Sequence, residues 1–148
     1  MGYNQQLLRV DYEKIYPIND ELSSKILGVI KNLNGKSDIL VISDYAKGLI
    51  TKELMDDIKK EFKGKILIDP KPKNDFYKDV YLIKPNLKEA SQILGREIEN
   101  KDDELEKSGL ESVDKYNSNF VITRGEKGAT LITVDEIFTM FQQKSKRS

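Results

Sequence analysis

The stretch DILVISDYAKG, residues 38–48, decides the fold class. Residues 38–43 form a largely apolar run of strand length, which is typical of a buried central strand in a parallel sheet. An acid, a phenol, a lysine and a glycine follow it, namely Asp44, Tyr45, Lys47 and Gly48. Because a turn needs only the glycine and the aspartate, the other two side chains indicate chemistry at the end of the strand.

The hydrophobic pattern around this strand alternates between the helical and the extended period. Helical patterns cover residues 19–35, 51–64, 86–95 and 102–117. Strand patterns cover residues 6–13, 38–43, 65–69, 80–84, 119–124, 128–133 and 136–141. This succession predicts an α/β fold with a mostly parallel sheet and helices on both faces.

The composition narrows the chemistry. The 148 residues carry 25 basic and 25 acidic side chains, and this balance gives no reason to expect nucleic acid or a membrane surface as partner. The sequence contains no cysteine and no histidine, which excludes disulfides, thiolate metal sites and histidine-based nucleophile pairs. The remaining candidates are carboxylates, lysine, arginine, hydroxyls, backbone amides or an oxygen-bound metal. Without a membrane-length apolar run or a signal peptide, we expect a cytoplasmic protein.

Ligands of parallel sheets bind beyond the carboxyl ends of the strands, and two of these ends carry acids and lysines. Strand 38–43 is followed by Asp44 and Lys47, and strand 65–69 ends in Asp69, with Lys71 two residues later. Each pair has a simpler interpretation, as a turn with a solvated lysine or as a surface ion pair of small energy.

Two further strand ends carry motifs with both a structural and a functional interpretation. Asn86 and Glu89 have the spacing of a helix capping box, and their oxygens also suit a magnesium shell. Strand 119–123 ends in Thr123, and Gly125 and Gly128 come soon after it. They fit a hairpin that needs glycine for positive φ, or a backbone turn beside a phosphate.

Five segments in this order resemble the ribokinase-like (PfkB) carbohydrate kinases. They are NQQLLRVDYE, VISDYAKGLIT, ILIDPK, LIKPNLKEA and VITRGEKGATLI. Within that family they are most similar to the heptose 7-phosphate kinases of ADP-heptose synthesis. The resemblance implies a three-layer α/β sandwich that is incomplete at both ends, ATP and Mg²⁺ as cofactors, a sugar phosphate as substrate, and a homodimeric parent kinase.

The resemblance also implies roles for individual residues. An ATP-binding segment matches Asn86, Leu87, Lys88 and Glu89, with Glu89 at the magnesium ion, while Thr123, Gly125 and Gly128 match the element beside the nucleotide. Asp44, Lys47, Asp69 and Lys71 would face the crevice between sugar phosphate and γ-phosphate, and Arg9 is a candidate for the phosphate of the sugar.

The family's catalytic aspartate lies in a Gly-Ala-Gly-Asp segment, which this sequence does not contain. We therefore expect residues 1–141 to be part of a kinase domain, inactive alone, and residues 142–148 to be a disordered basic tail. Two alternatives stay open. The sugar acceptor could be of the ribose or fructose type, or the chain could be a non-catalytic nucleotide-binding remnant.

Overall fold

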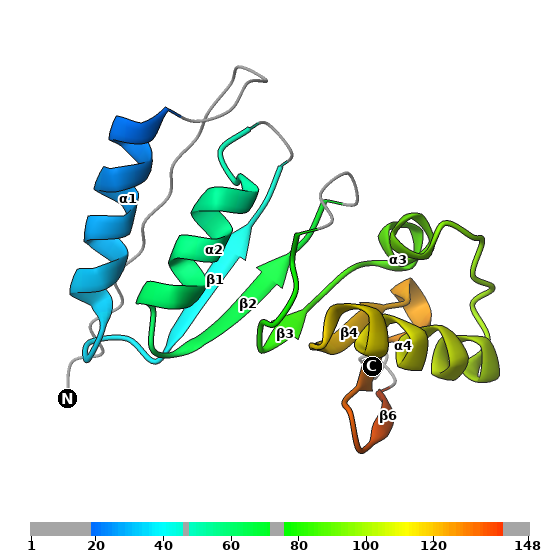
Figure 1. Ribbon diagram of the computed structural model, residues 1–148. Coiled ribbons are helices and arrows are strands. Elements are labelled where there is room, and N and C mark those ends of the chain that lie inside the picture. Colours follow the sequence, from blue (N-terminus) through cyan, green and yellow to red (C-terminus); the bar gives the residue numbers. More distant parts are fainter. Residues whose placement is uncertain (1–18, 46–47, 72–75, 141–148) are drawn as a thin grey trace, which may run out of the picture.

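The computed structural model describes residues 19–45, 48–71 and 76–140 (Figure 1). Strand 6–13 with Arg9, the lysine at position 47, and the tail 142–148 lie outside these residues. The helices are α1 (Asp20–Leu33), α2 (Lys52–Glu61), α3 (Leu87–Leu94) and α4 (Asp102–Tyr116), with a 3-10 turn η1 (Gly125–Lys127). The strands are β1 (Ile39–Ser43), β2 (Lys65–Asp69), β3 (Leu82–Ile83), β4 (Asn119–Thr123), β5 (Ala129–Ile132) and β6 (Ile137–Met140).

Within the described residues the strands form one six-stranded sheet in the order of the sequence, from β1 to β6. Strands β1 to β4 pair in parallel. Strand β5 pairs antiparallel with β4, and β6 pairs antiparallel with β5. This arrangement confirms the prediction of an α/β fold with a mostly parallel sheet.

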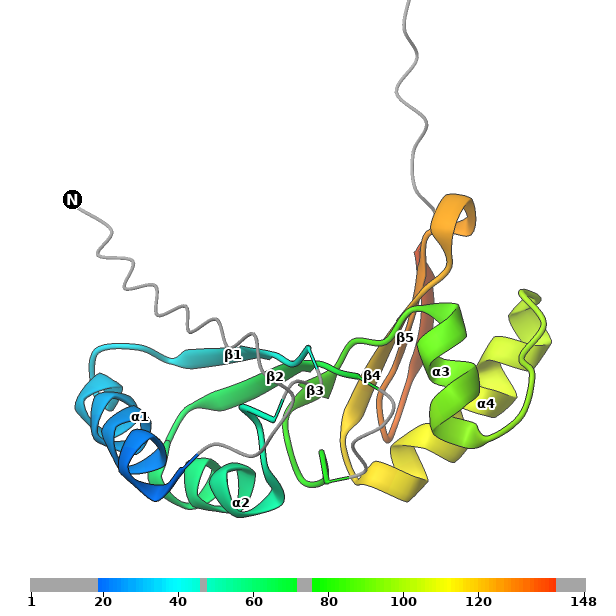
Figure 2. The same ribbon diagram turned by 90° about the horizontal axis from the view of Figure 1, so that it is seen from above.

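All four described helices lie on one face of the sheet (Figure 2). The prediction of helices on both faces is therefore wrong for this part of the chain. The reason is the strand order. A crossover between parallel strands is right-handed, so a sheet that grows in one direction places every crossover on the same face. Periodicity along the sequence gives the elements but not the direction in which the sheet grows.

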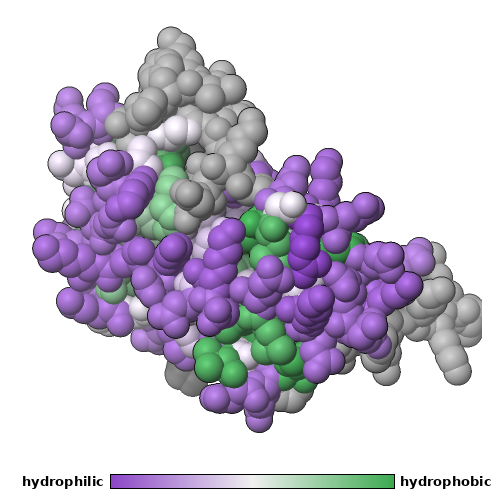
Figure 3. Space-filling model, turned by 45° about the vertical axis from the view of Figure 1, so that its right-hand side comes forward, coloured by the Kyte–Doolittle hydropathy of each residue, from purple (hydrophilic) through white to green (hydrophobic). Residues whose placement is uncertain are grey.

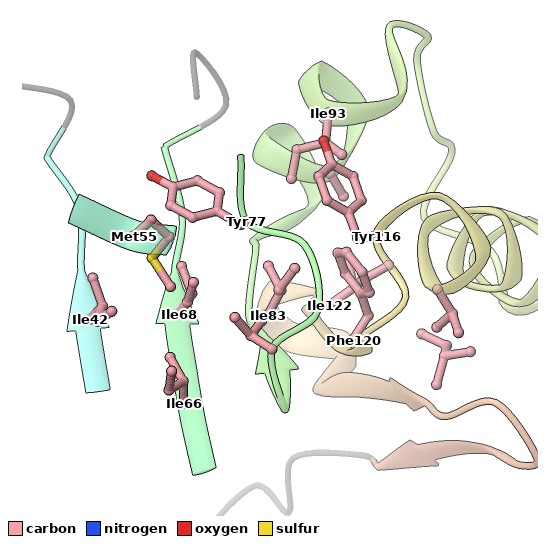
Figure 4. Close-up of a cluster of buried hydrophobic side chains, with 14 of the residues drawn as sticks. Ile42, Met55, Ile66, Ile68, Tyr77, Ile83, Ile93, Tyr116, Phe120 and Ile122 are labelled. Carbon is pink, nitrogen blue, oxygen red and sulfur yellow. The ribbon is translucent and has the colours of Figure 1, made fainter. Parts of the chain in front are cut away.

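The hydrophobic core fills the space between this sheet and the helices (Figure 4). Paired residues of neighbouring strands point to the same face, and the row Ile42, Ile68, Ile83, Phe120 and Ile132 is buried throughout. The connection from β2 to β3 has no helix in its described residues, and Tyr77 from this connection is 2% exposed within the same core.

The opposite face of the sheet is much less covered. On β1, which is the edge strand of the described sheet, Ile39 is 54% and Val41 is 65% exposed. Their neighbours on β2 include the exposed Lys65 and the half-buried Leu67. Among the described residues the sheet thus has one face covered by helices and one open face (Figure 2).

Side-chain caps begin three of the helices where the sequence predicts a start. Asn19 accepts from the Leu22 amide, Thr51 from the Leu54 amide, and Asn86 from the Glu89 amide. Each cap satisfies an amide that the first helical turn leaves without a partner. No helix among the described residues has the length and apolarity needed to cross a membrane.

Candidate functional site

Main-chain hydrogen bonds bring together, at one edge of the sheet, the four strand ends that carry the candidate charged and polar residues. The Asp44 amide donates to the Asp69 carbonyl at 3.1 Å, which joins the ends of β1 and β2. The Thr123 amide donates to the Pro85 carbonyl at 3.0 Å, and Asn86 pairs with Thr123 as a parallel bridge. The end of β4 therefore lies directly beside the start of α3, as expected for the carboxyl edge of a parallel sheet.

Lys71 connects the two halves of this edge. Its Nζ lies 3.5 Å from Glu89 Oε2 and 5.8 Å from the ring centre of Tyr45. We call Tyr45, Asp69, Lys71, Asn86, Glu89 and Thr123 the carboxyl-edge cluster. It combines a cation, two carboxylates, an amide and two hydroxyls. The cation can bind phosphate oxygens, and the oxygen atoms can bind a hydrated metal ion.

The capping-box interpretation of Asn86 and Glu89 is confirmed. The Glu89 amide donates to Asn86 Oδ1 at 2.7 Å, and the Asn86 amide donates to Glu89 Oε1 at 3.0 Å. One carboxylate oxygen of Glu89 thus faces the cap and the other faces Lys71. Of the two residues between Asn86 and Glu89, Leu87 packs against the core and Lys88 is exposed.

Asp44 is placed differently from its neighbours. It is only 3% exposed, because strand alternation turns it toward the helix face while Ser43 points to the open face. Its carboxylate accepts a hydrogen bond from the hydroxyl of Tyr77. The sequence places Asp44 in the crevice, whereas in the structure it lies beneath the edge. Asp69, at the end of β2, is half-buried on the open face.

The glycine turn, residues 123–128, has the conformation expected of a glycine-dependent hairpin. Gly125 has φ 62° and Gly128 has φ 82° with ψ −129°, and the 3-10 turn η1 lies between β4 and β5. The second conformation is essentially restricted to glycine. The turn thus exposes main chain beside Asn86 without side chains at either glycine.

Two residues of this region were not assigned by sequence reasoning. Tyr77 supports Asp44 from a separate segment of chain, and no local pattern marks it. Arg124 lies inside the glycine turn, and its burial is the unexpected feature, since only 1% of its side chain is exposed. Among the described residues no group of three or more acidic side chains is close enough to hold a metal by itself.

The fold and its edge define an α/β protein whose parallel strands end in a cluster of charged and polar side chains, at the edge where parallel sheets commonly bind their ligands. Comparison with family models identifies the family, because the model of the pfkB family carbohydrate kinases matches residues 16–146. The chain belongs to this family of carbohydrate kinases.

Curated relatives and solved structures agree with the family. The chain is 37% identical over 139 residues to the bifunctional protein HldE of Shewanella loihica, covering 91% of this chain and 28% of that protein. It is 38% identical over 141 residues to the bifunctional protein HldE of Campylobacter fetus, covering 91% of this chain and 30% of that protein. The chain thus spans less than a third of these relatives.

Two solved structures share the fold. Phosphofructokinase-2 from Escherichia coli, in complex with substrates and products, matches with a TM-score of 0.71 at 20% identity, over 88% of this chain and 44% of that one. Ribokinase from Thermotoga maritima matches with a TM-score of 0.60 at 23% identity, over 78% of this chain and 39% of that one. The ribokinase-like fold class predicted from the sequence is confirmed.

Proposed function

We propose that this chain forms part of an ATP-dependent sugar-phosphate kinase that phosphorylates a heptose 7-phosphate in ADP-heptose synthesis. The observation that carries the proposal is the carboxyl-edge cluster, in which Lys71 lies between Tyr45 and Glu89. The heptose acceptor is supported by the sequence motifs and by the curated relatives, which are bifunctional HldE proteins.

The nucleotide would lie at the Asn86–Glu89 segment and the glycine turn. The first turn of α3 offers main-chain amides and the positive end of the helix dipole to phosphate oxygens. Glu89 would hold Mg²⁺ together with the phosphates, since the described residues offer no complete protein ligand set. When bound, Mg²⁺ neutralises charge on the transferring phosphoryl group.

Lys71 has a double role in this proposal. In the structure its ammonium group neutralises Glu89. A bound magnesium ion would take over that neutralisation and leave Lys71 to contact a phosphate, as a compact point charge suited to oxyanions. Asp69 and the lysine at position 47 would line the sugar-phosphate side, with Arg9 at the phosphate of the sugar, and Asp44 would hold the end of β1 from below.

The reaction moves one phosphoryl group. The acceptor hydroxyl oxygen bonds to the γ-phosphorus, the bond from that phosphorus to the bridging oxygen breaks, and ADP leaves. The hydroxyl proton passes to a base, which the family places in the Gly-Ala-Gly-Asp segment absent from these 148 residues. We therefore expect phosphoryl transfer only from a polypeptide that also carries this segment.

The test of the site uses calorimetric titration of the chain with MgATP. Glu89→Gln removes the charge but keeps an oxygen for the cap, so it should weaken MgATP binding without unfolding α3. Asn19→Ala is the matched control, because Asn19 caps α1 with the same geometry, with a 2.8 Å bond to the Leu22 amide. Equal MgATP affinity of the unchanged chain and an Asn86→Ala/Glu89→Ala variant would refute the site.

The acceptor is tested separately, by measuring ADP release from a longer polypeptide that includes the catalytic segment. Heptose 7-phosphate, fructose 6-phosphate and ribose are offered in parallel. Preference for heptose 7-phosphate supports the proposal, and preference for fructose 6-phosphate or ribose replaces the substrate but keeps the enzyme class. Absence of transfer to all three would favour a nucleotide-binding protein without catalysis.

A further inference from the structure

Arg124 has an unusual environment for an arginine. It is the last residue before η1, and its guanidinium is almost fully buried. Nε donates to Asn100 Oδ1 at 2.8 Å, and NH1 donates to Thr130 Oγ1 at 3.1 Å. NH1 also lies 2.8 Å from Asp102 Oδ1, on the first residue of α4.

The main chain of the glycine turn is attached to the same residues. The Arg124 amide donates to the Gly128 carbonyl at 2.7 Å, and Asn100 Nδ2 donates to the Arg124 carbonyl at 3.3 Å. Lys127 Nζ donates to the Asn100 carbonyl at 2.6 Å. The turn is therefore fixed to the segment 100–102 from both of its ends.

The side chains of Thr123 and Arg124 point to opposite sides of the sheet edge. In β4 the buried Phe120 and Ile122 point to the helix face, and the half-buried Thr123 points to the open face. Arg124 continues this alternation and points beneath the edge, away from the side on which Thr123 lies. Arg124 thus holds the turn from behind and leaves its front to the nucleotide.

Burying a guanidinium is unfavourable unless its donors are satisfied and its charge is paired. Here Asn100 accepts from Nε, Thr130 accepts from NH1, and Asp102 beside NH1 supplies the opposite charge. Lysine has a single ammonium and no rigid fork, so it does not reproduce this geometry.

We propose that Arg124 is a positioning residue that fixes the glycine turn against the segment 100–102 and so presents the turn's main chain to the nucleotide. The part of this inference that concerns nucleotide binding rests on the proposed function. Its structural half, the restraint of the turn, is independent of any ligand.

The experiment compares Arg124→Met with Arg96→Met. Arg96 is the matched control, because it also joins α4 to the preceding chain, through Glu104 at 2.7 Å and Glu111 at 2.8 Å. Its hydrogen bonds and ion pairs go to residues of α4 and not to the glycine turn. Both variants are studied by amide hydrogen exchange and by MgATP titration, at a temperature at which thermal unfolding curves show both to be folded. Asn100→Ala, which removes two of the hydrogen bonds to Arg124, is the second test variant.

We expect Arg124→Met and Asn100→Ala to speed exchange of the Gly128 amide and to weaken MgATP binding by about tenfold to a hundredfold, the effect of a small displacement of a binding group. Arg96→Met should change neither. Unchanged MgATP affinity in folded Arg124→Met or Asn100→Ala would overturn the positioning role. If the unchanged chain binds no MgATP, the proposed function fails, and the exchange of Gly128 alone decides whether Arg124 restrains the turn.

Discussion

At the scale of single residues, the pair of Asp44 and Tyr77 explains how an acid can be buried at the end of β1. A carboxylate removed from water needs hydrogen-bond donors to replace those it loses. The Tyr77 hydroxyl is one donor, and Tyr77 itself is anchored in the hydrophobic core (Figure 4). The tyrosine therefore links the core to the carboxyl edge.

Tyr77→Phe should destabilise the protein, because it removes a hydrogen bond to a buried carboxylate, a change that costs about 1.5–3 kcal/mol. Urea denaturation measures the loss. Tyr81→Phe is the control, since Tyr81 is 46% exposed and its substitution should change the free energy of unfolding by less than about 0.5 kcal/mol. Equal effects of both substitutions would show that the Asp44 contact contributes nothing.

The residues that sequence reasoning placed correctly are those whose partners are close in the sequence. Asn86 and Glu89 are three positions apart, so their capping box follows from the local pattern. Asp44 and Tyr77 are 33 positions apart, and Arg124 and Asn100 are 24 apart. No periodicity relates such pairs, so the burial of Asp44 and the role of Arg124 had to come from the structure.

At the scale of elements, α4 packs closely on β5 because Gly109 has no side chain. A Cβ at Gly109 would lie 2.4 Å from Ile132 Cγ1, and Ile132 is fully buried. By sequence this glycine weakens the middle of a helix, but in the structure it permits the contact between helix and sheet.

Gly109→Ala should therefore be destabilising, since overpacking a core costs about 1–3 kcal/mol and exceeds the gain in helix propensity. Gly28→Ala in α1 is the opposite case, because nothing lies within 4 Å of the added Cβ, and it should stabilise by about 0.5–1 kcal/mol. Thermal and urea denaturation of both variants check the signs. Stabilisation by Gly109→Ala would contradict the close packing.

Arg96, just after α3, pairs with Glu104 and Glu111 of α4. This contact should make the free energy of unfolding depend on pH. The Arg96 hydrogen bond lowers the pKa of Glu111 below the usual 4.5. A lowered pKa in the folded state stabilises above the unfolded pKa and loses this effect as the pH falls through the folded value. The difference in unfolding free energy between the unchanged chain and Arg96→Met should be full above pH 4.5 and shrink below it. A difference independent of pH in urea denaturation would refute the pair.

At the scale of the whole molecule, the one-sided sheet leaves apolar side chains on its open face. The face of the molecule seen in Figure 3 is largely hydrophilic, with hydrophobic areas between the polar side chains. At the edge of the described sheet, β1 exposes the branched apolar residues Ile39 and Val41, and such a strand is a site at which chains can pair.

We expect the chain to self-associate through this face, and Val41→Lys to reduce the association. Val134→Lys is the control, because Val134 is 69% exposed, similar to Val41, but lies between β5 and β6 rather than on the sheet. Sedimentation velocity over a range of concentrations measures the effect. A chain that stays monomeric at all concentrations, or equal effects of both lysines, would contradict this expectation.

The sequence by itself determined most elements of the described part, the capping box of Asn86 and Glu89, and which strand ends carry charged and polar residues, because these depend on residues close together in the chain. The tertiary structure decided what depends on distant contacts. It placed all described helices on one face through the order of the strands, buried Asp44 against Tyr77, and turned Arg124 beneath the glycine turn. The physical reason is that periodicity and capping are local, whereas strand order and burial are properties of the packed chain.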